Sequence, residues 1–485
     1  MGIDLKINTF FTPLDANPNP PMQTEKEFWK AREHAARAGY LQYLTEKEYG
    51  NFKNLRRQSP ALLSLCAVLR EDGHKVGYFI PDSTEIDAQM TREIGNCNIL
   101  LMNSMTANFN LAVEYAKRFR ATNPRVLIGI GGHHAPYLPE NSLIINGQKV
   151  FDFTVWGYSE NAVTEIARKY KEHGLPESIF NVPQSSFVNS SGNIEQNPGT
   201  SFPNLAKIPL PANDLIPTDN LVAARVFTAY GCPFNCEMCN LGQHRSYSER
   251  PLQLFEEEIR FLRERKGVKY FYIGDPTLAA NIKRFRHIVH ILGKFPDIKW
   301  GGQTRLPIAQ NPDFLEILKD SNCVHLELGI ETFSQKLLDR IRKGTKSKTA
   351  EQTVYNLAKL KTDLNVETNW MFSVPGADES TIQFDTEKIR QLAQNGISVH
   401  LVPFVPFPGT PIYNHPEQFG IRIEAKDYSQ YAFRNGVVFS QIGGLSREKL
   451  NQLYEVTLKT ITGEIRKRLK TTTPEILSEI SSEPF

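Results

Sequence analysis

The chain has 485 residues, of which 40% are hydrophobic and 22% charged, with a net charge of +3. This length favours two or three domains, and the composition is that of an ordinary globular protein. So small a net charge argues against a broad nucleic-acid-binding surface. The sequence has no run of about 18 apolar residues, so no membrane span is expected.

The six cysteines do not have the spacing of a disulfide framework. Three stand close together, and Cys66, Cys97 and Cys323 are scattered, as small buried hydrophobic residues would be. This usage suits a reducing compartment, and the first residues form no secretory signal. We therefore expect a cytoplasmic protein.

The first part of the chain alternates between strand-like and helix-like segments. Apolar runs predict strands at 3–11, 75–80, 98–102, 125–130 and 151–156. Apolar faces predict helices at 61–70 and 111–119, whereas the charged stretch 25–50 is predicted to be a helical surface insertion. This alternation indicates an α/β fold with a parallel, doubly wound sheet over residues 1–184.

Small and polar residues stand at the ends of these predicted strands, namely Ser104, Thr106, Gly131, Gly132, Gly157 and Glu160. Ligands of doubly wound sheets bind beyond the carboxyl ends of the strands, where small residues let a large ligand approach the backbone. His133 and His134 follow the glycine pair, where exposure is the simplest expectation. The alternative is a domain that holds no ligand and only supports the next one.

Residues 185–220 are rich in Ser, Asn and Pro. This composition predicts a loop that tethers two domains.

Three cysteines, Cys232, Cys236 and Cys239, follow a strand-like run at 221–230 with C-x3-C-x2-C spacing. A [4Fe–4S] cluster usually has four cysteine ligands, so three local ones would leave one iron open to a small molecule. Gly231 suits the tight loop that this requires. The alternatives are three unrelated buried thiols or a zinc site, which would need a fourth ligand, and only His244 is near.

Further strand-like runs occur at 268–273, 298–302, 324–330, 366–374 and 397–404, with helical stretches between them. With 221–230 they make six β–α units over 221–411, and function in such barrels lies at the carboxyl ends of the strands. Those ends carry Gly274, Asp275, Gln303, Arg305 and Glu331. The planar fork of Arg305 suits a carboxylate, although a surface salt bridge is the alternative for each charged residue.

The tail, residues 412–485, is predicted to be a separate small cap. Apolar residues at helical spacing predict one helix, and they are Leu450, Leu453, Tyr454, Val456, Leu458 and Ile461. Three aromatic residues precede it, Tyr428, Tyr431 and Phe433, and core packing is the simplest role for them.

The cysteine motif at the end of a first strand resembles that of the radical S-adenosylmethionine (SAM) enzymes. The order of elements before it, with the Gly-Gly-His-His and Gly-x-x-Glu strand endings, resembles the cobalamin-binding domain of one large subfamily, the class B radical SAM methyltransferases. The likeness covers about residues 55–415. It implies a Rossmann-like cobalamin-binding domain, a partial (β/α)6 barrel and a helical C-terminal cap.

The resemblance also implies cofactors and their ligands. It implies a [4Fe–4S] cluster on the three motif cysteines, together with SAM and cobalamin. The implied SAM contacts are Met238, Gly274, Asp275, Gln303, Arg305 and Glu331. The implied cobalamin contacts are Ser104, Thr106, Gly131, Gly132, Gly157 and Glu160. Met238 stands where an aromatic residue is common in the family, and an adaptable Met can pack near adenine.

The Asp-x-His-x-x-Gly loop, whose His would bind cobalt from below, is missing. The nearest candidate, residues 82–87, contains no His. We therefore expect cobalamin to bind without a lower protein ligand.

The resemblance implies a C-methyltransferase that acts on an unactivated carbon of a small molecule, natural product or peptide. Flavodoxin or ferredoxin would donate electrons, and no nucleic-acid partner is expected. Three alternatives stay open: a non-methylating enzyme of ring formation or rearrangement, an enzyme whose first domain has lost cobalamin, and a module that only senses SAM or iron. The residues do not identify the substrate.

Overall fold

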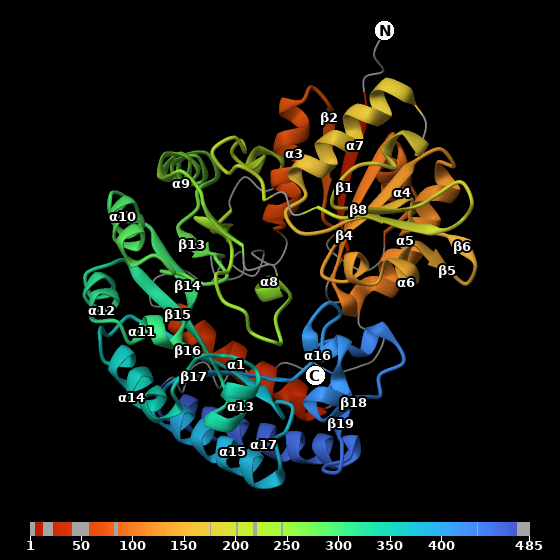
Figure 1. The fold of residues 1–485 in the computed structure, drawn as a ribbon. Coiled ribbons are helices and arrows are strands. Elements are labelled where there is room, and N and C mark those ends of the chain that lie inside the picture. Colours follow the sequence, from red (N-terminus) through yellow and green to blue (C-terminus); the bar gives the residue numbers. More distant parts are fainter. Residues whose placement is uncertain are drawn as a thin grey trace.

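The computed structural model describes residues 5–12, 23–40, 58–81, 86–174, 176–199, 202–216, 221–243, 246–433 and 435–472. Two α/β units stand side by side in Figure 1, the first in orange and yellow and the second in green and blue. Helix α1 (Gln23–Tyr40), in red, lies across the second unit although it belongs to the N-terminal part of the chain.

The first unit is built on a seven-stranded sheet in the order β2-β1-β3-β4-β7-β8-β9. Its five parallel strands are β2 (Lys75–Phe79), β1 (Lys6–Phe11), β3 (Ile99–Ser104), β4 (Leu127–Gly132) and β7 (Phe153–Val155). The doubly wound parallel sheet predicted from the alternating pattern is therefore confirmed.

Helices cover both faces of this sheet, which explains why its parallel strands are mostly apolar. On one face, α3 (Pro60–Glu71) and α7 (Glu160–His173) pack against buried strand residues such as Leu101. On the other face, α4 (Ala88–Gly95), α5 (Phe109–Thr122) and α6 (Pro139–Leu143) pack against positions such as Leu100. Short elements complete the unit, namely η2 (Thr106–Asn108), η3 (Ala135–Tyr137), β5 (Ile144–Ile145), β6 (Gln148–Lys149) and η4 (Pro176–Ile179).

The prediction that residues 185–220 form only a tether is wrong for its first part. Strands β8 (Ser185–Val188) and β9 (Ile194–Asn197) pair antiparallel with the edge of the first sheet. Phe187 is buried against Phe180, with their rings stacked at 4.4 Å. The polar composition misled the prediction because Ser185 and Ser186 are polar residues that are nevertheless buried in β8, while the turn that follows them is largely exposed. A short η5 (Asn213–Leu215) follows.

The second unit contains a six-stranded sheet in sequential order, β10-β13-β14-β15-β16-β17, with every neighbouring pair parallel. The strands are β10 (Ala223–Val226), β13 (Tyr270–Ile273), β14 (Lys299–Arg305), β15 (Cys323–Glu331), β16 (Asn365–Phe372) and β17 (Ser398–Pro403). The helices between them are α9 (Leu252–Lys266), α10 (Ile282–Gly293), α11 (Leu306–Ala309), α12 (Pro312–Lys319), α13 (Gln335–Arg340), α14 (Ser347–Ala358) and α15 (Glu379–Gln394). This arrangement is the predicted partial (β/α)6 barrel.

The run at 221–230, predicted as one strand, is two strands. β10 ends at Val226, and β11 (Ala229–Gly231) pairs with β12 (Tyr247–Glu249) in a separate hairpin. The break follows from Asp275, whose carboxylate accepts the N–H groups of Thr228 and Ala229. Those N–H groups are consequently not available to the barrel sheet.

Helix α1 is not the surface insertion that its charge suggested. Phe28 and Ala31 are buried in the core of the barrel unit, and Phe28 is 0% exposed. α1 packs along α17 (Arg447–Thr472) and also contacts β17, the last strand of the open barrel. The helix therefore covers an edge of the sheet that six strands leave open.

The predicted C-terminal helix is present as α17, and in the described part of the tail it packs into the barrel core instead of standing apart as a separate cap. Leu450, Tyr454, Leu458 and Ile461 on α17 are each 0% exposed within the barrel core. Val456, which was predicted on this apolar face, is 59% exposed. Short elements connect β17 to α17, namely α16 (Pro411–Asn414), η6 (Pro416–Phe419), β18 (Ile421–Ile423), η7 (Tyr428–Gln430) and β19 (Phe439–Gln441). A further short helix, α8 (Asn240–Gln243), directly follows the three motif cysteines.

The aromatic residues before α17 divide in their exposure. Tyr431 is buried and Tyr428 packs on His134 of the first unit, as core packing predicts, whereas Phe433 is 44% exposed. None of the described helices combines the length and apolar character needed to cross a membrane.

The packing of α1 makes the barrel unit depend on Phe28. Phe28→Ala should lower the free energy of unfolding by about 3–5 kcal/mol, because it removes a fully buried aromatic ring and leaves a cavity. Urea unfolding followed by circular dichroism measures this change. Lys26→Ala on the exposed face of the same helix is the control and should leave the midpoint unchanged. Equal midpoints for both variants would contradict the assigned packing of α1.

Candidate functional site

The three motif cysteines lie in the loop of the β11–β12 hairpin, at the carboxyl edge of the barrel. Cys236 is buried, and Cys232 and Cys239 are half-buried. The loop begins at Gly231, which has φ +78°, and a Cβ there would collide with the Ser246 carbonyl. The N–H of Cys232 donates to that same carbonyl at 2.9 Å. Glycine is thus required where the two hairpin arms approach.

Asp275, at the end of β13, holds the start of this loop. Its carboxylate is 4% exposed and accepts from Thr228 N at 2.7 Å, from Ala229 N at 3.2 Å and from the Thr228 hydroxyl. Burial raises the pKa of Asp275 to about 6, against these hydrogen bonds. In this structure the acid therefore anchors the cysteine loop, and its expected contact with SAM stays a prediction.

Arg305, at the end of β14, reaches the cysteines. Its Nη1 donates to the Cys236 sulfur at 3.4 Å, and its guanidinium lies 3.8 Å from the ring centroid of Phe234. Nη2 donates to the Lys343 carbonyl, and the Lys343 ammonium pairs with Glu331 at 2.5 Å. The structure thus brings Arg305 and Glu331 together through Lys343. Phe234 and Lys343, which both contact Arg305, were not predicted as site residues.

The remaining predicted SAM residues lie around the same edge. Gln303 is half-buried and its amide is 3.4 Å from the Asp275 carbonyl. Gly274 joins β13 to β10 through a hydrogen bond to Val226 O at 2.8 Å. Met238 is half-buried against the barrel core. Thr277, which was not predicted as a site residue, lies 3.4 Å from the Cys232 sulfur.

Left-handed backbone conformations occur beside this edge. Ala279, Glu331 and Ser373 have φ values of 60°, 68° and 59°, and they follow or end β13, β15 and β16. Such conformations cost energy in residues other than glycine and gather at functional sites. Strain at three strand ends is a second sign, independent of the cysteines, that ligands bind at this edge.

The spacing of the cysteine sulfurs favours a cluster over a single metal ion. Around one zinc ion, thiolate sulfurs lie about 3.8 Å apart, given Zn–S bonds of about 2.3 Å. Among the described residues, one group of three potential metal-binding side chains has its ligand atoms within 4.8 Å of one another, and it does not contain the cysteines. The thiols, the donor from Arg305 and the open loop therefore fit a multi-iron cluster, and His244 lies outside the described residues.

The predicted cobalamin residues of β3 and β4 are neighbours in the first sheet. Ser104 pairs in register with Gly132, and Thr106 donates to the His133 carbonyl at 3.4 Å. Gly132 has φ +101°, and a Cβ there would collide with the Ser104 backbone, whereas a Cβ on Gly131 would make only ordinary contacts at 3.6 Å. Two backbones therefore approach closely at this edge, and side-chain bulk is absent.

Buried polar atoms without protein partners lie beside these glycines. Both ring nitrogens of His134 are unpartnered and the residue is 0% exposed, contrary to the expectation that it is exposed. Burial lowers the pKa of His134 to about 3, so the ring is neutral. Thr12, directly after β1, and Thr154, on β7, also have buried unpartnered hydroxyls. Such orphaned groups with a glycine cradle fit a large ligand with many polar atoms.

Gly157 and Glu160 follow β7 and lead to the other unit. Gly157 is exposed with φ +65°, but the Glu160 carboxylate is buried and accepts from the Ser64 hydroxyl at 2.8 Å. Burial raises the pKa of Glu160. Its carboxylate therefore faces the boundary between the units instead of the edge formed by Gly131 and Gly132, here called the glycine edge. Its contact with cobalamin stays a prediction. Residues 82–85, in the nearest candidate for a histidine loop, lie outside the described residues.

A group of four residues, here called the tyrosine joint, connects the two units: Ser64, Tyr158, Glu160 and Tyr230. The rings of Tyr158 and Tyr230 stack at 4.6 Å with an interplanar angle of 13°. The Tyr158 hydroxyl accepts the N–H of Gly231 at 2.5 Å, directly before Cys232. In the opposite direction, Tyr230 lies beside Ser64: burial raises the pKa of Tyr230, and the nearby Ser64 hydroxyl opposes that shift.

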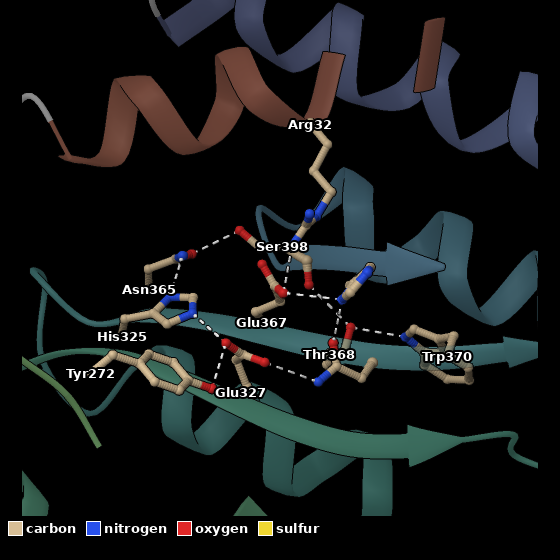
Figure 2. A network of polar contacts seen from close by, with 11 residues as sticks. Arg32, Tyr272, His325, Glu327, Asn365, Glu367, Thr368, Trp370 and Ser398 are labelled. Carbon is tan, nitrogen blue, oxygen red and sulfur yellow. Dashed lines mark hydrogen bonds and ion pairs between the residues drawn. The ribbon is translucent and has the colours of Figure 1, made fainter. Parts of the chain in front are cut away.

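The barrel interior contains a polar network below the cysteine loop, drawn in Figure 2. Glu327 on β15 accepts from the Tyr272 hydroxyl at 3.0 Å and from Asn369 at 3.3 Å, and His325 lies 3.4 Å away. Burial opposes ionisation of Glu327, but His325 and Asn369 lower the pKa of Glu327 below its usual range. The carboxylate is therefore anionic and satisfied by protein donors.

Arg32 of α1 reaches into the same network from outside the sheet (Figure 2). It pairs with Glu367 on β16 at 2.6 Å, and the His400 ring lies 3.6 Å from the same carboxylate oxygen. His325, Glu327 and Glu367 have the spacing of a metal site. Because Arg32 already neutralises Glu367 and three donors satisfy Glu327, we interpret the group as an ion-pair network.

Two family models match this chain. The B12 binding domain matches residues 58–167, and the radical SAM superfamily matches residues 226–383. The first match covers the sheet with the glycine edge, and the second begins at the last residue of β10 and includes the three cysteines.

Curated relatives include enzymes with different names. The chain is 23% identical over 386 residues to the anaerobic magnesium-protoporphyrin IX monomethyl ester cyclase of Cereibacter sphaeroides, and this match covers 76% of the chain but 61% of the relative. It is 24% identical over 356 residues to the bacteriochlorophyllide d C-12(1)-methyltransferase of Chlorobaculum tepidum, covering 70% of each protein.

Solved structures share the fold over both units. The radical SAM methyltransferase TsrM from Kitasatospora setae, solved with tryptophan and aza-SAM, has a TM-score of 0.67 at 12% identity, covering 94% of this chain and 89% of that one. The cobalamin-dependent radical SAM enzyme OxsB, with aqua-cobalamin and SAM, has a TM-score of 0.60 at 15% identity, covering 86% of this chain and 56% of that one.

Both domain matches cover units whose geometry fits their cofactors, which are a [4Fe–4S] cluster and SAM in the barrel and cobalamin on the first sheet. The chain therefore combines a B12 binding domain with a radical SAM domain, and it shares the fold of TsrM over both units.

Proposed function

We propose that this enzyme is a C-methyltransferase that methylates an unactivated carbon of a small molecule, natural product or peptide. The observation that carries the proposal is the tyrosine joint, which connects the turn after β7 of the first sheet directly to the cysteine loop. Two cofactors held so close can act on one substrate. Methyltransferases among the curated relatives support the proposal.

The chain's own residues bind and orient in this proposal. When bound, the cluster with SAM supplies a radical that removes hydrogen from carbon, and cobalamin supplies the methyl group. Cys232, Cys236 and Cys239 hold the cluster, Asp275 fixes the loop that carries them, and Arg305 donates a hydrogen bond to the Cys236 sulfur. An electron donor such as flavodoxin or ferredoxin completes the system.

SAM would bind beside the cysteines, between the ends of β13, β14 and β15. The proposed contacts are Met238, Gly274, Asp275, Gln303, Arg305 and Glu331. The unpartnered Nε of Arg305 is buried at this place, so the guanidinium retains one donor for a carboxylate.

The substrate would lie in the barrel interior, with the polar network as its floor. Glu327, Asn369 and His400 are half-buried and so retain accessible surface there. Arg225, on β10, is exposed and its guanidinium lies 5.1 Å from the Tyr272 ring. A floor with both signs of charge suits a substrate with hydrogen-bonding groups at the end away from the reacting carbon.

A second candidate is a ring-forming enzyme with the same cofactors. The cyclase relative favours it, because that match covers 76% of the chain. The two candidates differ in whether a methyl group leaves SAM, and a module that only senses SAM would release neither product.

Product analysis separates these functions. The reconstituted protein with hydroxocobalamin, methyl-deuterated SAM and a strong reductant should form both 5′-deoxyadenosine and S-adenosylhomocysteine, detected by mass spectrometry. Tryptophan and a magnesium tetrapyrrole are the first substrates to test for gain of a labelled methyl group. The control is the triple variant Cys232→Ala, Cys236→Ala, Cys239→Ala, which should lose the cluster absorbance and 5′-deoxyadenosine. Deoxyadenosine without S-adenosylhomocysteine would favour ring formation, and neither product would indicate a sensor.

Arg305→Ala should retain the cluster but weaken SAM binding by about 1.5–3 kcal/mol, the range for a hydrogen bond to a charged group. Equilibrium binding of SAM to the reconstituted variant measures this loss. Arg342→Ala is the control, because Arg342 also lies beside the loop, paired with Glu237, but is 63% exposed. Unchanged SAM affinity in Arg305→Ala would place this residue outside the SAM site.

Cobalamin should bind without a protein ligand below cobalt, and bulk at the glycine edge should exclude it. Gly131→Val keeps an ordinary backbone conformation, so loss of cobalamin after desalting would result from bulk alone. Gly293→Val, at the exposed end of α10, is the control, because that backbone conformation is also ordinary and a Cβ there meets open space. Nitrogen hyperfine coupling from a histidine in the electron paramagnetic resonance spectrum of the cob(II) state would overturn the ligand-free assignment.

A further inference from the structure

The tyrosine joint is the connection that the two cofactor-binding edges share. Tyr158 directly follows Gly157, the turn at the carboxyl end of β7. Its hydroxyl accepts the N–H of Gly231, which is bonded covalently to Cys232. One side chain of the first sheet thus reaches the residue next to a cluster ligand.

The connection runs in both directions. The ring of Tyr230 of the barrel unit stacks on Tyr158 and lies beside Ser64 on α3, and Ser64 donates to Glu160 at the start of α7. Each unit therefore contacts the other through a backbone or a side chain, and the two rings stack at the centre of this group. Phe202 packs on Tyr158 at 4.7 Å from the linker side.

The joint transmits movement because its hydrogen bond lies at a partly buried boundary between the units. Gly231 is buried and both tyrosines are half-buried, and a donor left without a partner at such a place costs more than it would in water. A shift of the Gly157 turn must therefore either carry Gly231 with it or break the hydrogen bond. Gly231 has little freedom of its own, since Ser246 and Phe202 lie close to its α-carbon.

We propose that the tyrosine joint couples the two sites, with Tyr158 as the positioning residue, so that cobalamin on the first sheet tightens SAM binding at the cluster. By thermodynamic linkage SAM must then tighten cobalamin binding by the same factor. The inference rests on the two cofactors and does not depend on methyl transfer.

The test measures SAM affinity of the cluster-reconstituted full chain with and without hydroxocobalamin. Cobalamin should tighten SAM binding by about fivefold or more, which corresponds to about 1 kcal/mol, in the wild-type protein. The same factor is expected in Tyr170→Phe, a tyrosine of α7 outside the joint. Tyr158→Phe, which keeps the stack but loses the acceptor, should show a smaller factor, and Tyr158→Leu should show less than twofold.

Two further readouts separate positioning from damage to the fold. Each variant should retain its iron content and its cobalamin after desalting, whereas the electron paramagnetic resonance spectrum of the reduced cluster should change in Tyr158→Phe. If Tyr158→Leu loses cobalamin, the nearly isosteric Tyr158→Phe decides. Equal cobalamin effects in the wild-type and Tyr158→Phe proteins, with identical cluster spectra, or no cobalamin effect in the wild-type protein, would overturn the proposal.

Discussion

The hydrogen bonds that the buried Asp275 carboxylate accepts from Thr228 and Ala229 are the constraint on which the cofactor geometry depends. They end β10 early and direct the chain out of the sheet into the hairpin that carries the cysteines. Without this anchor, nothing in the apolar run at 221–230 would stop the strand. The position of the cysteine loop relative to the barrel therefore depends on one carboxylate. Burial of this carboxylate disfavours its charged form and raises the pKa of Asp275.

The barrel unit meets the first unit at more than one point. The tyrosine joint reaches the cysteine loop at Gly231, and Tyr137 of η3 packs so closely on Gly409, after β17, that a side chain there would collide with its ring. The carboxyl edges of both sheets consequently face the same space. Ligands of both folds bind at those edges, so this arrangement alone brings two cofactor sites together.

The open edge of the barrel is covered by α1, a helix from the N-terminal part of the chain. Six strands leave an open edge, and α1 covers it with Phe28 in the core and Arg32 paired to Glu367. The buried charges of β15 and β16 are thereby paired within the protein. Unpaired charges in the barrel interior would destabilise the fold. A substrate would meet a preformed polar floor, whose shape depends on an N-terminal helix as well as on the barrel strands.

The sequence by itself determined the two parallel sheets and the cluster motif, because both are local patterns: short apolar runs at β–α spacing, and three cysteines within eight residues. It also placed Arg305 and the glycine pair at strand ends. Only the tertiary structure decided the burial of α1 and His134, the anchoring direction of Asp275 and the contacts of Tyr158, Phe234 and Lys343. Each of these depends on a partner distant in the chain, such as Arg32 with Glu367, and charge or periodicity within a segment cannot indicate which distant surface it will meet.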